Sequence, residues 1–73
     1  MQIFVRGDHT TVIDVEPTDT ILSVKEQIWD REGIPPRFLL ITYAGRIRED
    51  WQTLTECAVE VQSTIHYRIR FSA

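Results

Sequence analysis

The stretch "TDTILSVKEQIWDREGIPP", residues 18–36, decides how this chain folds, because it has the spacing of an amphipathic helix. Ile21, Val24 and Ile28 recur at intervals of three and four residues, so they fall on one helix face. Gly33 stands where a helix ends in a left-handed residue, and the prolines that follow prevent continuation. The spacing therefore predicts one helix, with three candidate residues to cap its beginning: Thr18, Asp19 and Thr20.

Alternation of apolar and polar residues predicts strands on both sides of this helix. Two alternating runs, residues 1–6 and 10–15, are joined by a short turn and predict a β-hairpin, in which Gly7 can take a positive φ. The run "RFLLITY", residues 37–43, predicts a third strand, which the turn "AGR" ends. Residues 46–62 are polar and irregular, with Leu54 and Val59 as isolated apolar anchors. With one short strand after the third, the expected order is strand, strand, helix, strand, short strand, strand.

The chain ends in another alternating run, "TIHYRIRF", residues 64–71. Here Ile65, Tyr67 and Ile69 point to one side of the strand, and the opposite side carries His66, Arg68 and Arg70. The expected fold class is α+β, with a mixed four- to five-stranded sheet packed on one helix. One helix covers only one face of a sheet, so the face with the basic residues meets water or a partner.

Composition restricts the possible functions. Seventy-three residues, 42% hydrophobic and 26% charged, predict a single globular domain over residues 1–73. The one cysteine, Cys57, has no partner for an internal disulfide, and no residue cluster indicates a metal or a cofactor. The apolar runs are too short to span a membrane, so we expect a cytoplasmic or nuclear setting. A net charge of −3 argues against general nucleic-acid binding.

Several blocks of sequence, in order and at nearly constant spacing, resemble ubiquitin: "MQIFV" at 1–5, "VEPTDTI" at 15–21, "VK" at 24–25, "EGIPP" at 32–36, "AGR" at 44–46, "ED" at 49–50, "TL" at 53–54 and "STIH" at 63–66. The first hairpin is two residues shorter than that of ubiquitin, as in the ubiquitin-like leader of the Fau ribosomal-protein precursor. The resemblance implies a β-grasp (ubiquitin-like) fold and a protein of the ubiquitin superfamily.

Conjugation of ubiquitin requires a tail that ends in two glycines, and the matching end here is Arg70-Phe71-Ser72-Ala73. We therefore expect that the chain as given is not conjugated and acts by non-covalent protein–protein binding. Two alternatives stay open. The chain is a covalent modifier whose glycines lie outside the given sequence, or it is the cleavable leader of a fusion precursor.

Ubiquitin also accepts other ubiquitins on its lysines, and here arginine stands at three of those positions, Arg6, Arg31 and Arg46. Arginine keeps the positive charge but forms no isopeptide bond. The remaining lysine, Lys25, matches a ubiquitin lysine that pairs with the equivalent of Asp50, so we expect a structural ion pair.

The apolar docking surface of ubiquitin is changed in this chain. By the resemblance, its isoleucine matches Thr42, its valine matches Arg68, and its histidine is kept as His66. We expect a basic sheet face that binds a protein partner with an acidic segment, or less readily RNA, and not the helices that bind ubiquitin. A merely solvated face is the alternative. The residues expected to form this surface are Arg6, Thr42, Arg46, His66, Arg68 and Arg70.

Apolar side chains stand where ubiquitin is polar or small, and they predict either a second docking surface or local packing: Leu22, Trp29, Phe38 and Trp51. Trp29 lies off the apolar stripe, so it should be at least half exposed. Cys57 fits a buried structural residue better than a nucleophile paired with a histidine, and His9 lies in a turn that we expect to be solvated. The sequence thus predicts a monomeric binding domain, with no enzymatic activity and no small-molecule substrate.

Overall fold

The computed structural model describes residues 1–70, so the predicted strand end at Phe71 and the tail Phe71-Ser72-Ala73 lie outside the described residues. Along the described chain the elements are β1 (Gln2–Arg6), β2 (Thr10–Asp14), α1 (Ile21–Glu32), a 3-10 turn η1 (Pro36–Phe38), β3 (Leu39–Tyr43), β4 (Arg46–Ile47) and β5 (Thr64–Ile69). None of the helical segments within residues 1–70 has the length and apolar content that a membrane crossing requires.

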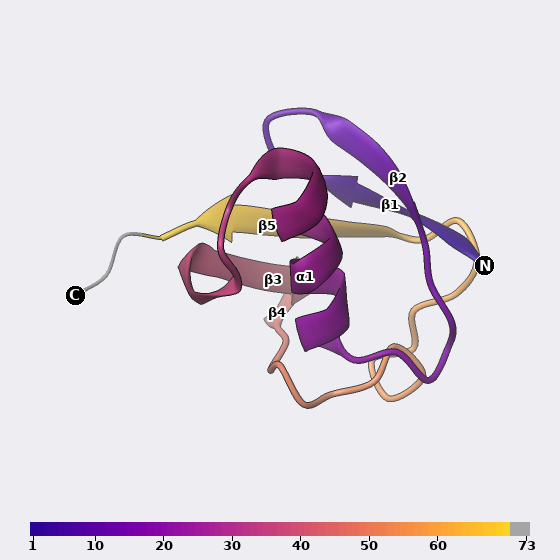
Figure 1. Ribbon diagram of the computed structural model, residues 1–73. Helices are drawn as coiled ribbons and strands as arrows, with labels where there is room; N and C mark the ends of the chain where they lie inside the picture. The colour runs from indigo at the N-terminus through magenta and orange to yellow at the C-terminus, as the bar shows by residue number, and fades with distance from the viewer. Residues whose placement is uncertain (71–73) are drawn as a thin grey trace.

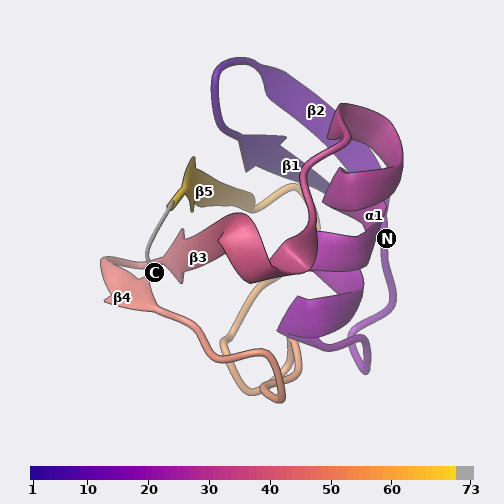
Figure 2. The same cartoon turned by 60° about the vertical axis from the view of Figure 1, so that its left-hand side comes forward.

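The five strands form one mixed sheet in the order β2-β1-β5-β3-β4. The first and last strands, β1 and β5, are neighbours in the middle of the sheet and run parallel, and the other neighbouring pairs are antiparallel. The helix α1 lies across one face of the sheet, and no helix or strand within residues 1–70 lies over the opposite face (Figures 1 and 2). This arrangement is the expected α+β, β-grasp fold.

The helix has the predicted boundaries for local reasons. Thr20 is the N-cap, and its side-chain oxygen accepts a hydrogen bond from the Ser23 backbone N–H at 3.2 Å. Gly33 ends the helix in the left-handed conformation, with φ 76°, and its N–H donates to the Trp29 carbonyl. Both caps satisfy backbone groups that a helix end leaves unpaired.

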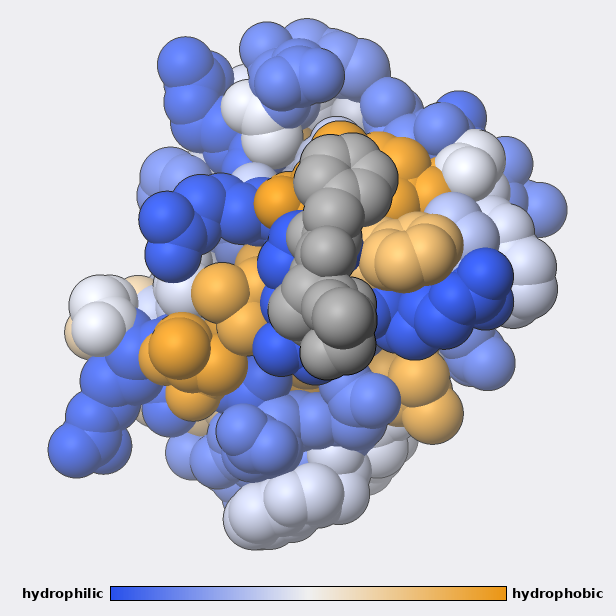
Figure 3. All heavy atoms as spheres, turned by 90° about the vertical axis from the view of Figure 1, so that its left-hand side faces the viewer, coloured by the Kyte–Doolittle hydropathy of each residue, from blue (hydrophilic) through white to orange (hydrophobic). Residues whose placement is uncertain are grey.

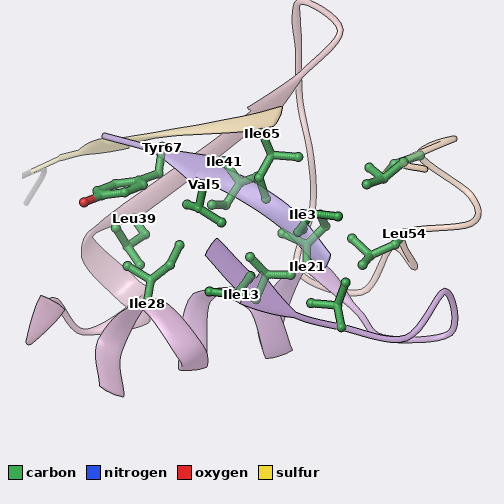
Figure 4. Packing of buried hydrophobic residues seen from close by; sticks show 14 residues of the cluster. Ile3, Val5, Ile13, Ile21, Ile28, Leu39, Ile41, Leu54, Ile65 and Tyr67 are labelled. Carbon is green, nitrogen blue, oxygen red and sulfur yellow. The ribbon is translucent and has the colours of Figure 1, made fainter. Parts of the chain in front are cut away.

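The core lies between the sheet and α1, where the inward side chains of the strands meet the apolar stripe of the helix (Figure 4). The two anchors predicted in the long irregular segment, Leu54 and Val59, are both buried in this core, and Cys57 is buried with them. The residues with less than 2% of their surface exposed are Ile3, Val5, Ile13, Ile21, Val24, Leu39, Ile41, Leu54 and Ile65.

The start of the third strand differs from the prediction. Arg37 and Phe38 belong to η1 and not to the third strand, because the Phe38 N–H turns back to the Pro35 carbonyl, 3.0 Å away. The turn at Ala44-Gly45 leads into a short strand, β4, which is the short strand expected between the third and the last strand.

Gly7 was predicted to provide a positive φ, but its backbone is not in the left-handed region. The reason for glycine is the Tyr67 ring. A Cβ built on Gly7 would lie 2.2 Å from Cζ and 2.5 Å from Oη of that tyrosine, closer than atoms can approach. The turn between β1 and β2 therefore packs directly against β5.

Candidate protein-binding face

One row of side chains crosses the whole uncovered face of the sheet. In this row His66 of β5 is the direct neighbour of Arg6 on β1 and of Thr42 on β3. Thr10 on β2 extends the row beyond Arg6, and Ile47 on β4 extends it beyond Thr42. Neighbouring strands lie about 5 Å apart, so side chains of adjacent members of the row can contact one partner together.

Arg68 lies two residues beyond His66 and projects to the same side, because side chains alternate along a strand. Its neighbour on β3 is Leu40. Arg70 follows the end of β5, and its backbone N–H donates to the Phe38 carbonyl at 2.8 Å, which continues the alternation by one residue. We call Arg6, Thr42, His66, Arg68 and Arg70 the basic face.

The positive charges of the basic face are not neutralised within the described part of the chain. The Arg6 guanidinium donates to the Thr10 hydroxyl at 3.0 Å, which orients it over the sheet without cancelling its charge. Between residues 1 and 70, the ion pairs do not include His66, Arg68 or Arg70, and all three residues are exposed. The side chains can therefore form new charged contacts without first breaking internal ones.

Arg46, which was expected to share this face, stands apart from it. It pairs across the β3–β4 turn with Tyr43, and the Tyr43 ring packs against the core on the helix side of the sheet. A residue pair directly opposite in a sheet projects to one side, so Arg46 lies at the sheet edge on the side of Tyr43. The two-residue turn at Ala44-Gly45, both with positive φ, sets this register.

Apolar residues that were not singled out from the sequence border the basic face. Ile47 is 57% exposed at the β4 edge, and the partly buried Leu40 lies beside Arg68. On the other side of the row, Phe4 and Val12 are neighbours across β1 and β2. The period-two pattern of "RFLLITY" already placed Leu40 on the same side as Thr42, so that signal could have found it.

A hollow of about 340 Å³ adjoins the basic face at the end of β5. Figure 3 shows this end of the molecule, where hydrophobic and strongly hydrophilic residues lie next to one another. The residues that line the hollow are Gly7, Asp8, Tyr67, Arg68 and Ile69. Burial raises the pKa of the Tyr67 phenol above its usual 10.0, and the negative charges of Glu32 and Asp8 raise it further.

The residues of the expected second surface fall into two places. Leu22 lies near Trp51, because the Leu22 backbone N–H donates to the Asp50 carbonyl at 3.0 Å, and both side chains are exposed. Trp29 is 51% exposed, as expected, on the outer side of α1. Phe38 is only partly exposed, and the Arg37 guanidinium stacks over its ring.

Three residues that were considered as an ion-pair partner, a nucleophile or a base are buried or paired within the domain. Lys25 is 7% exposed, and its Nζ contacts Asp50 Oδ1 at 2.5 Å, which is the expected ion pair. Cys57 is 3% exposed. His9 is exposed but is not free of contacts, because its Nε2 lies 3.2 Å from Glu32 Oε2 at the end of α1.

Within residues 1–70 no group of histidine, cysteine and carboxylate side chains has an arrangement that could hold a metal ion. The basic face is thus an exposed sheet face that carries arginine charges and has apolar residues at its borders. A comparison with models of protein families matches residues 3–72 to the ubiquitin family.

Proposed function

This chain belongs to the ubiquitin family, and from that membership we propose that it binds other proteins non-covalently through the basic face, in a cytoplasmic or nuclear setting. The observation that carries the proposal is the row Arg6–His66–Thr42 with Arg68 beside it, on the sheet face that α1 leaves uncovered. Cys57, the one thiol of the sequence, is buried in the core and is therefore not accessible as a nucleophile.

The partner that fits this face is a protein segment with several carboxylates. Arginine presents a rigid fork of donors that matches a carboxylate, and its charge is permanent. Arg6 and Arg68 lie on neighbouring strands, β1 and β5, with His66 between them along the surface. Carboxylates spaced along an extended segment could contact these cations, while an apolar residue of the partner packs on Leu40 or Ile47.

The same residues disfavour the helices that bind ubiquitin through an apolar surface. Burial of an isoleucine-sized or valine-sized side chain contributes about 1.5–3 kcal/mol. Thr42 and Arg68 stand at those two places, so most of the binding energy of a weak complex, about 4–8 kcal/mol in total, is lost. We propose that contacts with the charges of the basic face contribute more to partner binding than contacts with its apolar borders.

Family membership also favours a second function, that of a covalent modifier or the cleavable leader of a fusion precursor. Attachment of another modifier to a lysine of this chain does not fit, because the single lysine, Lys25, is buried and paired with Asp50. Activation of the C-terminus of the protein for conjugation is tested by incubating the natural full-length gene product with ubiquitin-type activating enzymes and ATP. A thioester adduct in the mass spectrum would establish the modifier.

The binding proposal is tested by NMR titration of the ¹⁵N-labelled domain with a blocked acidic peptide of sequence DEDVE. We expect shifts centred on Arg6, His66 and Arg68, and weaker binding at about 0.15 M than at about 0.02 M salt, because ions screen exposed charges. The neutral peptide NQNVQ controls for the apolar contact. Shifts centred on α1, or equal shifts with the neutral peptide, would show that the proposal is wrong.

A matched pair of variants adds a second test. Arg68→Ala removes one cation of the basic face and should weaken binding of the acidic peptide about 2- to 5-fold, as expected for an exposed charge contact. Arg31→Ala removes an exposed cation from α1, on the other side of the sheet, and should leave the affinity unchanged. An equal loss in both variants would indicate only a non-specific effect of net charge.

A further inference from the structure

A second hollow lies on the outer side of α1, and the basic face does not include it. Its volume is about 220 Å³, and its lining residues are Glu26, Trp29 and Asp30. These residues stand at positions i, i+3 and i+4 of the helix, which places all three side chains on one exposed side. An aromatic ring is therefore flanked by two carboxylates at a depression in the surface.

The three side chains that line this hollow have an exposed ring and two carboxylates without a cationic partner among the described residues. Trp29 is 51% exposed, whereas Ile21, Val24 and Ile28 of the same helix are buried in the core. Within residues 1–70, Glu26 and Asp30 take part in none of the ion pairs or side-chain hydrogen bonds. Like charges four residues apart on a helix repel one another. A cation between the two carboxylates would remove this repulsion.

We propose that this hollow binds a lysine or arginine side chain from a basic segment of a partner protein. A cation over the face of an indole is attracted to the ring electrons, and tryptophan is the strongest of the aromatic residues in this respect. Glu26 and Asp30 supply the two negative charges that such a cation would pair with. We call these three residues the acidic tryptophan site.

The negative charge of the site favours a cationic side chain over an apolar one. An apolar side chain on Trp29 would remove water from Glu26 and Asp30 without offering them a partner, which costs free energy. A lysine or arginine instead lays its aliphatic stem on the ring and places its charge at the carboxylates. Leu22, one turn before Glu26 and also exposed, extends the surface available to such a stem.

The acidic tryptophan site and the basic face are on opposite sides of the domain, because α1 and the uncovered sheet face are separated by the core. They have opposite charge, so they select different partner segments. The domain could therefore hold a basic segment and an acidic segment at the same time.

The two tryptophans allow a direct test, since each gives its own indole N–H signal in an NMR spectrum. The probe is a blocked peptide, GRGRG, and its control has citrulline in place of both arginines, which keeps the shape and removes the charge. We expect a saturable shift of the Trp29 signal with the arginine peptide and not with the citrulline peptide. Trp51, on the loop after β4, serves as the internal reference and should shift less. A Trp29→Phe variant assigns the signals.

Variants locate the binding charges. Glu26→Gln and Asp30→Asn should each weaken binding of the arginine peptide about 2- to 5-fold, and the double variant should weaken it further. Glu60→Gln removes an exposed carboxylate elsewhere on the surface and should have no effect.

Three outcomes would overturn the inference. The first is equal shifts with the citrulline peptide, and the second is equal weakening by Glu60→Gln. The third is a Trp29 shift that depends on the concentration of the domain alone, which would assign the site to a second copy of this chain. Loss of the acidic-peptide binding described above leaves this test unaffected, since it uses neither the same face nor the same probe.

Discussion

Replacement of Gly7 by alanine tests how the turn between β1 and β2 is packed against β5. In most turns with ordinary backbone angles this change stabilises a protein by about 0.4–1 kcal/mol, because alanine has fewer conformations to lose on folding. Gly7 does not have a positive φ, so its backbone alone would allow the gain. The steric clash of the new Cβ with the Tyr67 ring should instead make the substitution destabilising.

The magnitude follows from the distances to the ring. The new Cβ would lie 2.2 Å from Tyr67 Cζ and 2.5 Å from Cε2, so the ring or the turn must move. The Tyr67 side chain is part of the core and is 8% exposed, which limits how far it can rotate away. Overpacking of this kind costs about 1–3 kcal/mol. After the entropic gain, we expect Gly7→Ala to destabilise the domain by about 1–2 kcal/mol.

Thermal unfolding followed by circular dichroism measures this effect. For a domain of this length, 1 kcal/mol corresponds to about 4–8 °C, so the midpoint should fall by about 4–16 °C. The control is the same substitution in a Tyr67→Leu background, where the ring is absent and most of the cost should disappear. A Gly7→Ala domain as stable as the wild type, or an equal loss in both backgrounds, would refute the reasoning.

Three further predictions concern stability. The pKa of Tyr67 is raised in the folded state, so the fold favours the neutral phenol. The contribution of Tyr67 to stability should be constant below the unfolded value of 10.0 and should be lost as the pH rises above it. Tyr67→Phe should reduce that alkaline loss in urea titrations followed by fluorescence. Asp50→Asn leaves the buried Lys25 charge without its partner and should lower the free energy of unfolding by about 1–2 kcal/mol in a denaturant titration. The loss is smaller than for a fully buried pair because Asp50 is 52% exposed. Lys25→Met should leave the free energy of unfolding nearly unchanged, and a large loss in that variant would contradict this explanation. Leu54→Ala should cost about 2–5 kcal/mol in the same assay, because the side chain is completely buried; a change below 1 kcal/mol would show that this loop does not anchor the core.

The candidate site could be predicted only in part from the sequence. The alternation in residues 64–71 identified His66, Arg68 and Arg70 as one side of a strand, because period two is a local property of an extended chain. Arg46 was misplaced, since its orientation depends on the register of a two-residue turn. Ile47 was not singled out because it lies in a strand of only two residues, too short for any pattern.

The sequence by itself determined the elements of this protein: a capped helix over Ile21–Glu32, the strands, and the α+β class, because caps and hydrophobic periods act within a few residues. Tertiary structure decided which side chains of different strands stand together. Arg6, His66 and Thr42 are far apart in the chain and became one row when β5 paired with β1 and β3. Gly7 likewise owes its identity to the ring of Tyr67, sixty residues later in the sequence and in direct contact only after folding. Strand pairing and packing are long-range choices, and no local pattern contains them.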